Sequence, residues 1–265
     1  MNVTTFASGS SGNCTLVSME GARFLIDAGI SFKRIRENLS VFGLEPDALT
    51  AVLITHEHSD HIGGLATMVK YTEIPVYAPR TVANRLRYAV PGIERKLREF
   101  PVGEDVLLDG VAVRAFHTPH DTDESVGWRL AGDRVFALAT DMGHVTDEIR
   151  AGLTGADVAL IEANHDVELL REGPYPYHLK KRILSGRGHL SNDDCAALAA
   201  ELAGSGTESI ILGHLSRENN TPEIALRTVS AALLTKVPDC KAGLYVAPGA
   251  ERLSVIAERE AVCSA

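Results

Sequence analysis

The sequence predicts an α/β fold in which β-sheets carry helices on their outer faces. Three observations indicate this. Short apolar runs of strand length recur along the chain and give way to segments with helical periodicity. Turn-forming pairs such as Asp109-Gly110 separate the predicted strands. Hydrophobic residues make up 45% of the 265 positions, which is ample for a sizeable core, and we expect residues 1–265 to form a single domain.

The first half of the chain is expected to be rich in strands. Apolar or alternating runs predict strands at residues 2–7, 14–18, 22–26, 51–54, 75–78, 104–109, 111–117, 125–131 and 134–140. Apolar residues at helical spacing predict helices at 31–42, 62–69 and 80–90.

In the second half, strands alternate with helices. Strands are predicted at 158–161, 210–212, 242–247 and 253–257, and helices at 166–172, 178–184, 191–203 and from Thr221 onward. Ser191 has the character of an N-cap, with Asp194 three positions later. Pro222 suits the first position of the last helix.

The composition is acidic and the cysteines are dispersed. Lys and Arg number 26 and Asp and Glu 35, so the net charge of −9 provides no global basic field for nucleic acid or membrane, although a local basic groove is compatible with it. Cys14, Cys195, Cys240 and Cys263 form no Cys-x-x-Cys pair and are expected to be free thiols. The N-terminus lacks a leader pattern, and no apolar run approaches roughly 18 residues. We expect a cytoplasmic protein without a membrane partner.

The densest group of metal-binding residue types follows the apolar run 51–54. It comprises His56, His58, Asp60 and His61. His56 and His58 are two residues apart, so both rings point to the same side of an extended backbone. Imidazole and carboxylate ligands suit zinc, manganese or iron. This loop therefore supplies two pairs of ligands, enough to begin two adjacent metal sites.

Three further candidates each follow an apolar strand: His120, Asp141 and His214. A carboxylate can bridge two cations, so Asp141 is expected to serve both. The predicted sets are His56, His58, His120 and Asp141 for one ion, and Asp60, His61, Asp141 and His214 for the other. Taken singly, a histidine such as His120 or His214 is more often a hydrogen-bonded structural residue, but beside the first loop we expect each to be a ligand. Asp27 ends the strand 22–26 and needs a partner there, so we expect it to orient a ligand.

This pattern resembles the metallo-β-lactamase-fold hydrolases, in their phosphodiesterase branch. The resemblance implies a four-layer αβ/βα sandwich with the metals at one edge of two facing sheets. Asp141 matches a bridging aspartate that true lactamases lack, and no cysteine falls at a matching position, which argues against lactam hydrolysis. The interval from Asp141 to His214 has no room for a β-CASP cap domain. We expect the segment after His214 to be too short for a glyoxalase-II-like helical domain as well as the closing elements of the fold.

Several local phrases resemble the WalJ/YycJ-like bacterial subgroup, which implies a DNA exonuclease acting from the 5′ end. These phrases are Ala7-Ser8-Gly9-Ser10-Ser11-Gly12-Asn13, Glu162-Ala163-Asn164-His165-Asp166, Gly188-His189-Leu190-Ser191-Asn192 and Gly213-His214-Leu215-Ser216-Arg217-Glu218-Asn219-Asn220.

His189 and the basic segment before it are candidates for substrate contact. His189 precedes a predicted helix N-terminus, where backbone N–H groups favour anions. In related phosphodiesterases a histidine here touches the phosphate without binding metal; the alternative is a loop histidine that forms part of the cap. Lys180, Lys181 and Arg182 lie in a stretch without acids and are expected to contact a polyanion, unless they form a solvated helix face.

The predicted chemistry is metal-assisted hydrolysis of a phosphodiester, with Asp60, Asp141 and His189 as the catalytic residues. The expected cofactors are two divalent ions, zinc or manganese, with iron as a further option. The expected partner is DNA or a small phosphodiester. A phosphodiesterase of cyclic or nucleotide substrates, a thioester hydrolase and a non-catalytic metal-binding sensor are alternatives. The sequence leaves the oligomeric state open, and a homodimer is one option.

Overall fold

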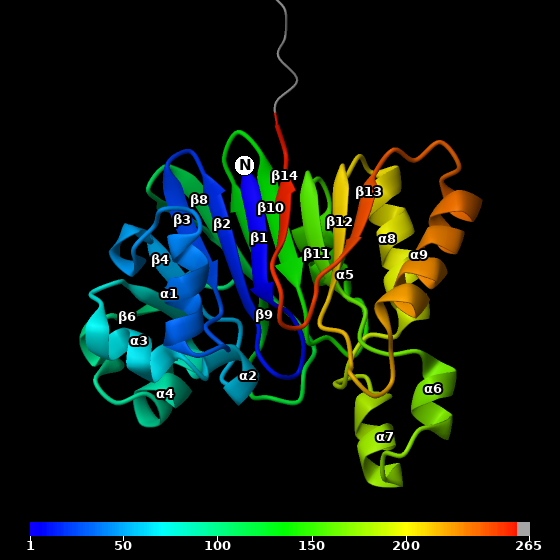
Figure 1. Cartoon of the computed structure of the whole chain (residues 1–265), viewed down its shortest axis with the longest axis horizontal. Helices are drawn as coiled ribbons and strands as arrows, with labels where there is room; N and C mark the ends of the chain where they lie inside the picture. Colours follow the sequence, from blue (N-terminus) through cyan, green and yellow to red (C-terminus); the bar gives the residue numbers. More distant parts are fainter. Residues whose placement is uncertain (259–265) are drawn as a thin grey trace, which may run out of the picture.

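The protein has two seven-stranded sheets packed face to face between layers of helices, as a computed structural model of residues 1–258 shows (Figure 1). This arrangement confirms the predicted αβ/βα sandwich. Cys263 and the last part of the predicted domain lie outside the described residues. Within residues 1–258, no helix has the length and apolar character needed to cross a membrane.

The first sheet has the strand order β14-β1-β2-β3-β4-β5-β6. Its strands are β1 (Asn2–Ala7), β2 (Cys14–Met19), β3 (Ala22–Ile26), β4 (Ala51–Leu53), β5 (Val76–Pro79), β6 (Leu97–Phe100) and β14 (Leu253–Ile256). The helices α1 (Phe32–Ser40), α3 (Leu65–Tyr71) and α4 (Arg80–Ala89) pack their apolar faces on its outer surface, with the short helices η1 (Pro46–Ala48) and η2 (Ile93–Arg95) in the connections.

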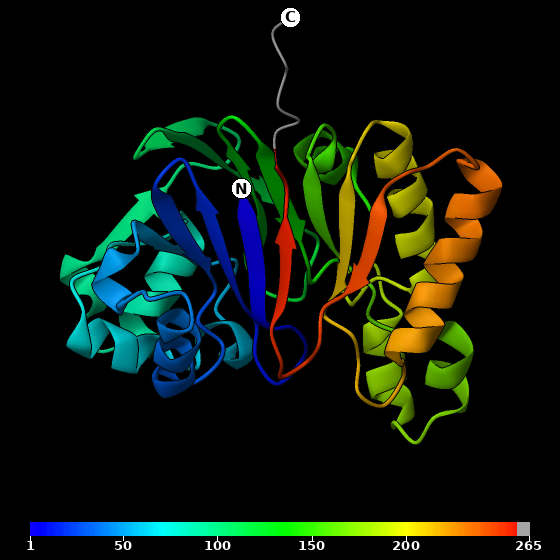
Figure 2. The same cartoon turned by 45° about the horizontal axis from the view of Figure 1, so that its top comes forward.

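The second sheet has the strand order β13-β12-β11-β10-β9-β8-β7. Its strands are β7 (Asp105–Leu108), β8 (Val111–His117), β9 (Val126–Ala131), β10 (Val135–Ala139), β11 (Val158–Glu162), β12 (Ser209–Gly213) and β13 (Gly243–Val246). Its outer face is covered by α5 (Asp147–Leu153), α8 (Asn192–Gly204) and α9 (Pro222–Lys236) (Figure 2). Ser191 caps α8 by accepting a hydrogen bond from the Asp194 backbone N–H, as its sequence position predicts.

The core between the sheets is built from the inward-facing side chains of both. Trp128, Phe24 and Phe136 are fully buried there. The rings of Phe100 and Trp128, one from each sheet, meet edge to face with their centroids 5.0 Å apart. Aromatic pairs favour this geometry, and burying such side chains is the main favourable contribution to folding.

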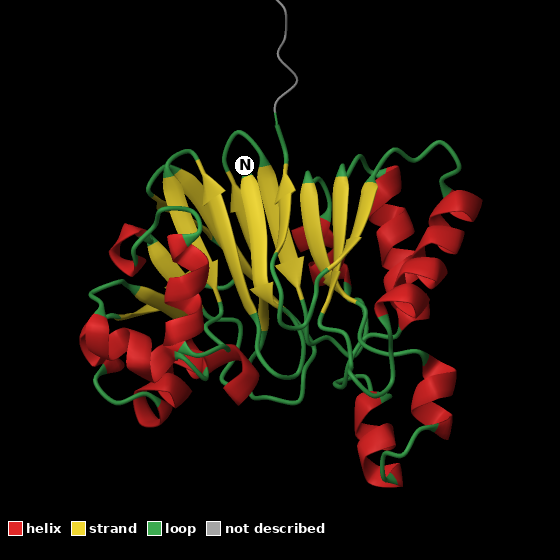
Figure 3. Ribbon diagram, in the orientation of Figure 1, coloured by secondary structure: helices red, strands yellow, loops and turns green. Residues whose placement is uncertain are grey.

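Parallel pairing places the functional loops along one edge. The strands β3 to β6 are parallel, and so are β10 to β13. The carboxyl ends of parallel strands meet at the same edge, so the loops after β3, β4, β10, β11 and β12 converge. Beyond this edge lie α2 (Ser59–Ile62), α6 (Val167–Glu172) and α7 (Tyr177–Ile183), at the bottom of the view in Figure 3.

The predicted helix at 62–69 is wrong in one respect, since the structure breaks it into α2 and α3 at Gly63 and Gly64. A Cβ atom on Gly64 would lie 2.1 Å from the Ile30 carbonyl oxygen, so only glycine permits this close approach. The strand β6 and the helix α5 are absent from the predicted elements.

Candidate metal centre

The ligand loop reaches the edge of the sandwich directly after β4. His56 is fully buried in the loop, His58 is the N-cap of α2, and Asp60 and His61 lie on α2 itself. One group of potential ligand atoms joins His56 and His58 with His120, and a second joins Asp60 and His61 with His214; within each group the atoms lie within 4.8 Å of one another.

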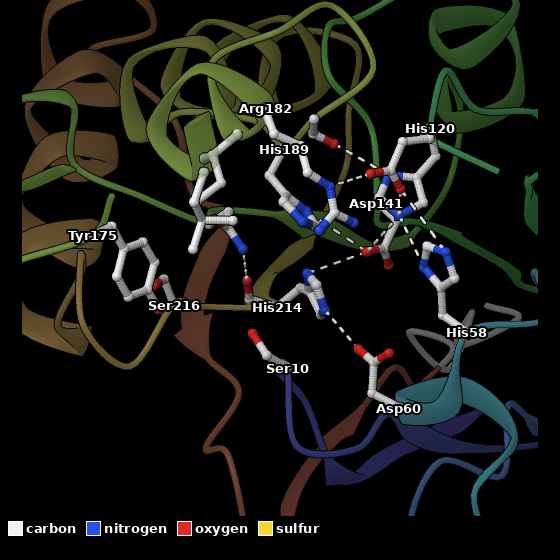
Figure 4. Close-up of a pocket in the computed structure, with 15 residues that line it drawn as sticks. Ser10, His58, Asp60, His120, Asp141, Tyr175, Arg182, His189, His214 and Ser216 are labelled. Carbon is white, nitrogen blue, oxygen red and sulfur yellow. Dashed lines mark hydrogen bonds and ion pairs between the residues drawn. The ribbon is translucent and has the colours of Figure 1, made fainter. Parts of the chain in front are cut away.

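Asp141 lies between these two groups (Figure 4). Its Oδ2 is 3.2 Å from His61 Nε2, and its Oδ1 is 3.7 Å from His120 Nε2. The structure thus brings together all seven residues predicted as metal ligands, with Asp141 in the position of a bridge.

Four of the five histidines in the cluster are held through Nδ1, so that Nε2 faces the centre, whereas His58 turns its Nδ1 toward His120. The four pairs are His56 Nδ1 with Thr55 Oγ1 at 3.0 Å, His61 Nδ1 with Asp27 Oδ2 at 2.7 Å, His120 Nδ1 with the Gly188 carbonyl oxygen at 3.2 Å, and His214 Nδ1 with Glu162 Oε1 at 2.9 Å. A proton on Nδ1 leaves the Nε2 lone pair for a metal, and such partners fix ring orientation in metal sites. Asp27 therefore occupies the supporting position predicted for it.

Several polar atoms at the centre are buried without a hydrogen-bond partner in the described structure. They are His56 Nε2, His214 Nε2 and Asp141 Oδ2. In addition, His58 Nδ1 and His120 Nε2 face each other at 3.3 Å. Buried polar atoms are normally paired. Unpaired nitrogen and carboxylate atoms converging on one point are the donor set that a divalent cation requires, so the residues present fit a metal centre.

The electrostatics favour positive charge at His61 and His214, in the second ligand group. Burial lowers the pKa of His61, but the Asp27 and Asp141 carboxylates outweigh that effect and raise this pKa to about 10. Burial likewise lowers the pKa of His214, whereas Asp141, Asp60 and Glu162 raise it well above its ordinary value. The carboxylates thus favour positive charge at these two rings. Bound cations would supply positive charge there as well.

Glu162, at the end of β11, has a supporting role that the predicted site residues did not include. It is fully buried. Its Oε1 lies 2.8 Å from His189 Nδ1 and 2.9 Å from His214 Nδ1, while Oε2 accepts hydrogen bonds from the backbone N–H groups of Met142 and Leu190. Although burial raises the pKa of this carboxyl, the charges and hydrogen bonds of the two histidines hold it below its usual range. One carboxylate therefore positions both rings.

His189 lies beside the ligand groups but is anchored differently. Its ring centroid is 5.2 Å from that of His120 and 5.3 Å from that of His214. Burial lowers the pKa of His189, but the Glu162 carboxylate outweighs that effect, so this pKa lies above its usual value. Since Nδ1 is engaged by Glu162, Nε2 is the ring nitrogen left for the pocket. The group is thus suited to contact or protonate a bound anion.

The N-terminal loop fixes the ligand loop in place. The Asn13 backbone N–H donates to the Asp60 carbonyl oxygen at 2.7 Å, and Asn13 Nδ2 lies 3.0 Å from His61 Nε2. Ser8 Oγ accepts a hydrogen bond from the His214 backbone N–H at 2.8 Å. These contacts give residues 8–13 a structural role that their glycine- and serine-rich sequence alone did not define.

The backbone is left-handed at three residues of the centre. The φ angles are 59° for Asp27, 55° for Asp141 and 55° for His214. Among described non-glycine residues, the other positive φ angles are those of Glu20 and Asp109, beside tight turns. Non-glycine residues seldom adopt this conformation except where surrounding structure imposes it, and such positions cluster at functional sites.

The centre opens into a pocket of about 260 Å³. Five of the seven predicted ligands line it together with His189, namely His58, Asp60, His120, Asp141 and His214. Tyr175, Leu179, Arg182 and Ile183 also line the pocket, and so do Ser10 and Ser216 (Figure 4).

The basic segment before His189 divides into different roles. Arg182 lines the pocket and pairs with Asp121. Arg187 donates to the backbone carbonyl oxygens of His120 and Thr122, which supports the site structurally. Lys180 and Lys181 do not line the pocket, and Lys180 Nζ donates to the Arg171 carbonyl oxygen at 2.6 Å.

A four-layer sandwich with histidine and carboxylate clusters at one edge defines a metal-dependent hydrolase. The chain belongs to the metallo-β-lactamase superfamily, in the group of YycJ and WalJ, because the β-lactamase superfamily domain matches residues 22–215 and two relatives cover most of the chain. The exodeoxyribonuclease YycJ of Bacillus anthracis is 36% identical over 238 residues, which are 89% of this chain and 90% of that protein. The exodeoxyribonuclease WalJ of Streptococcus pneumoniae is 39% identical over 227 residues, 84% of each chain.

Solved structures agree on the fold. The metallo-β-lactamase fold protein YhfI from Bacillus subtilis superposes with a TM-score of 0.71 at 14% identity, covering 96% of this chain and 99% of the other. Zn²⁺-bound PqqB from Methylobacterium extorquens also gives 0.71, at 18% identity, with 97% and 100% covered. The predicted fold, enzyme class and family resemblance are confirmed.

Proposed function

We propose that the protein is a DNA exonuclease that hydrolyses phosphodiester bonds at a dinuclear metal centre and degrades DNA from the 5′ end. The observation that carries this proposal is the convergence of two ligand groups on Asp141, beside a histidine that Glu162 positions toward the same pocket. The exodeoxyribonuclease names of the relatives support DNA as the substrate.

In this proposal His56, His58 and His120 would hold one divalent ion, Asp60, His61 and His214 would hold the other, and Asp141 would serve both. Zinc and manganese suit this donor set, with iron as a further option. When bound, such ions lower the pKa of water from about 15.7 towards about 7 and offset the charge on a phosphate. Asp27 and Glu162 keep the ligand rings oriented, and His189 contacts the phosphate or protonates the leaving oxygen through Nε2.

A smaller phosphodiester is the second candidate. A pocket of about 260 Å³ and a net charge of −9 suit a cyclic or nucleotide substrate as well as a DNA end. The buried free thiols Cys14 and Cys195 are consistent with the cytoplasmic location that we propose for either activity.

A substrate panel tests the proposal. Metal-loaded protein should release nucleotides from DNA labelled at the 5′ end before it shortens DNA labelled at the 3′ end. Hydrolysis of cyclic or nucleotide diesters alone would favour the second candidate. Hydrolysis of acyl-glutathione thioesters alone would indicate a thioester hydrolase. A metal-loaded protein that turns over none of these compounds would be a binding or sensor protein instead.

The salt dependence of binding should reveal whether Lys180 and Lys181 contact DNA outside the pocket. Each phosphate contact with a single strand contributes about −0.7 to the slope of log K against log salt. The double variant Lys180→Ala/Lys181→Ala should flatten the slope by about 0.7 for each lysine that contacts a phosphate. Titrations of a labelled oligonucleotide at several salt concentrations measure it.

The matched control removes two basic residues, Lys33 and Arg36, from α1 on the outer face of the first sheet. Lys33→Ala/Arg36→Ala changes the net charge equally but should leave the slope as in wild type. Equal slopes for all three proteins would assign Lys180 and Lys181 to a solvated helix face.

A further inference from the structure

The connection between α6 and α7 supplies an apolar wall to an otherwise polar pocket. Histidines and carboxylates make up much of the pocket lining, whereas Tyr175, Leu179 and Ile183 are its large apolar or aromatic members. In Figure 1 the two helices project beyond the strand ends, below the second sheet. Their position at the edge of the sandwich explains how residues of this segment line the same pocket as the candidate metal ligands.

Tyr175 is held by its neighbours in sequence. Pro174 and Pro176 flank it, and Pro176 is the N-cap of α7 with φ of −60°. Proline fixes its own φ angle and restricts the residue before it to extended conformations. The backbone at Tyr175 therefore has little freedom to lose on binding. It is half-buried, so one part of its surface is available to the pocket.

We propose that Tyr175, with Leu179 and Ile183, forms a subsite for the base of the terminal nucleotide of DNA. The enzyme then takes an unpaired end one nucleotide at a time. This inference rests on the proposed function. Aromatic side chains stack on any base because every base has a π-face. The pocket volume of about 260 Å³ lies just below the range of about 300–1,000 Å³ typical of small-molecule sites, which suits one nucleotide but not a helix end.

This subsite explains how the end of a strand would be selected. A base inside a duplex is paired and stacked between neighbours, so it must leave the stack before it can lie against Tyr175. Unstacking costs least when the nucleotide is already single-stranded. Ser10 and Ser216 line the same pocket, so their hydroxyl groups are available to the sugar or an adjoining phosphate (Figure 4).

The test compares an intact end with an abasic end. Two single-stranded oligonucleotides are used, identical except that one carries an abasic unit as its terminal nucleotide, and kcat/KM is measured for removal of that unit. Wild type should cleave the abasic end about 10-fold more slowly, the scale of one base–aromatic stack. Tyr175→Ala should lose this discrimination and cleave both ends at similar reduced rates. Tyr175→Phe should retain it.

Tyr177 provides the matched control, because it lies on the same segment, is 81% exposed and does not line the pocket. Tyr177→Ala should discriminate like wild type. The proposal is overturned if wild type cleaves both ends equally, if Tyr175→Ala keeps the difference, or if Tyr177→Ala loses it. The wild-type comparison needs no variant to fold. A protein that degrades no DNA end would refute the proposed function itself, whereas one that degrades DNA without discrimination would refute the subsite alone.

Discussion

Replacing Asp141 with alanine is expected to reduce bound metal from about two divalent ions per chain, the complement of a two-metal site, to one or none. Loss of a residue that only supports a metal ligand costs about 10–100-fold in activity, and turnover of Asp141→Ala should fall by more than that. Asp141 lies between the two ligand groups, so its removal takes a carboxylate oxygen away from each of them. Elemental analysis of protein purified without chelator, followed by assay, measures both effects.

Asp147→Ala is the control for Asp141→Ala, since it removes an exposed aspartate from the first turn of α5. It should retain the metal content and activity of wild type. Wild-type protein that binds no divalent ion, and gains no activity when zinc or manganese is added, would contradict the assignment of the centre.

His189→Ala is expected to lower turnover by about 100-fold or more while metal content and fold are retained, because a positioned acid contributes on that scale. Loss of metal from this variant would show that His189 is a ligand or supports one. Glu162→Gln should behave differently: it weakens the support of His214 as well as His189, so metal affinity should also fall, by about 10–100-fold.

The pH profiles of His189→Ala and Glu162→Gln show whether His189 acts in catalysis or only supports the structure. The Glu162 carboxylate favours the protonated form of His189 and so raises the pKa of that ring. Activity that needs the protonated ring is present below this pKa and declines as the pH rises through it. Removing the carboxylate charge lowers the pKa, so Glu162→Gln should lose activity at lower pH than wild type. At saturating metal, adding Glu162→Gln to His189→Ala should leave the pH profile of His189→Ala unchanged.

The sequence predicts the metal-binding residue types well because their signals are local. Four potential ligands lie within six positions after β4, and Asp141 and His214 each follow a buried strand. The structure then brings these separate segments together at one edge, as parallel strand order requires. Their binding of two ions stays a prediction that elemental analysis decides.

Glu162 and Arg187 illustrate what the sequence does not reveal. Glu162 ends a buried strand much as Asp141 follows one, so its position in the sequence marks it as a candidate. Which histidines Glu162 contacts depends on how β11 and β12 lie beside the loop that carries His189. Arg187 belongs to a basic segment, yet its guanidinium group donates to two backbone carbonyl oxygens of the loop after His120. Both roles depend on contacts between residues far apart in the chain.

The left-handed backbone at Asp27, Asp141 and His214 places stability and activity in conflict at these positions. Glycine adopts such a conformation without the steric cost borne by other residues, which is of order 1 kcal/mol or more per site. Exchange for glycine would relieve that steric cost, yet each such exchange removes a carboxylate or imidazole from the centre, together with its hydrogen bonds. The backbone conformation at these positions is thus tied to the side chains of the candidate metal centre, and a variant that relaxes it gives up their chemistry.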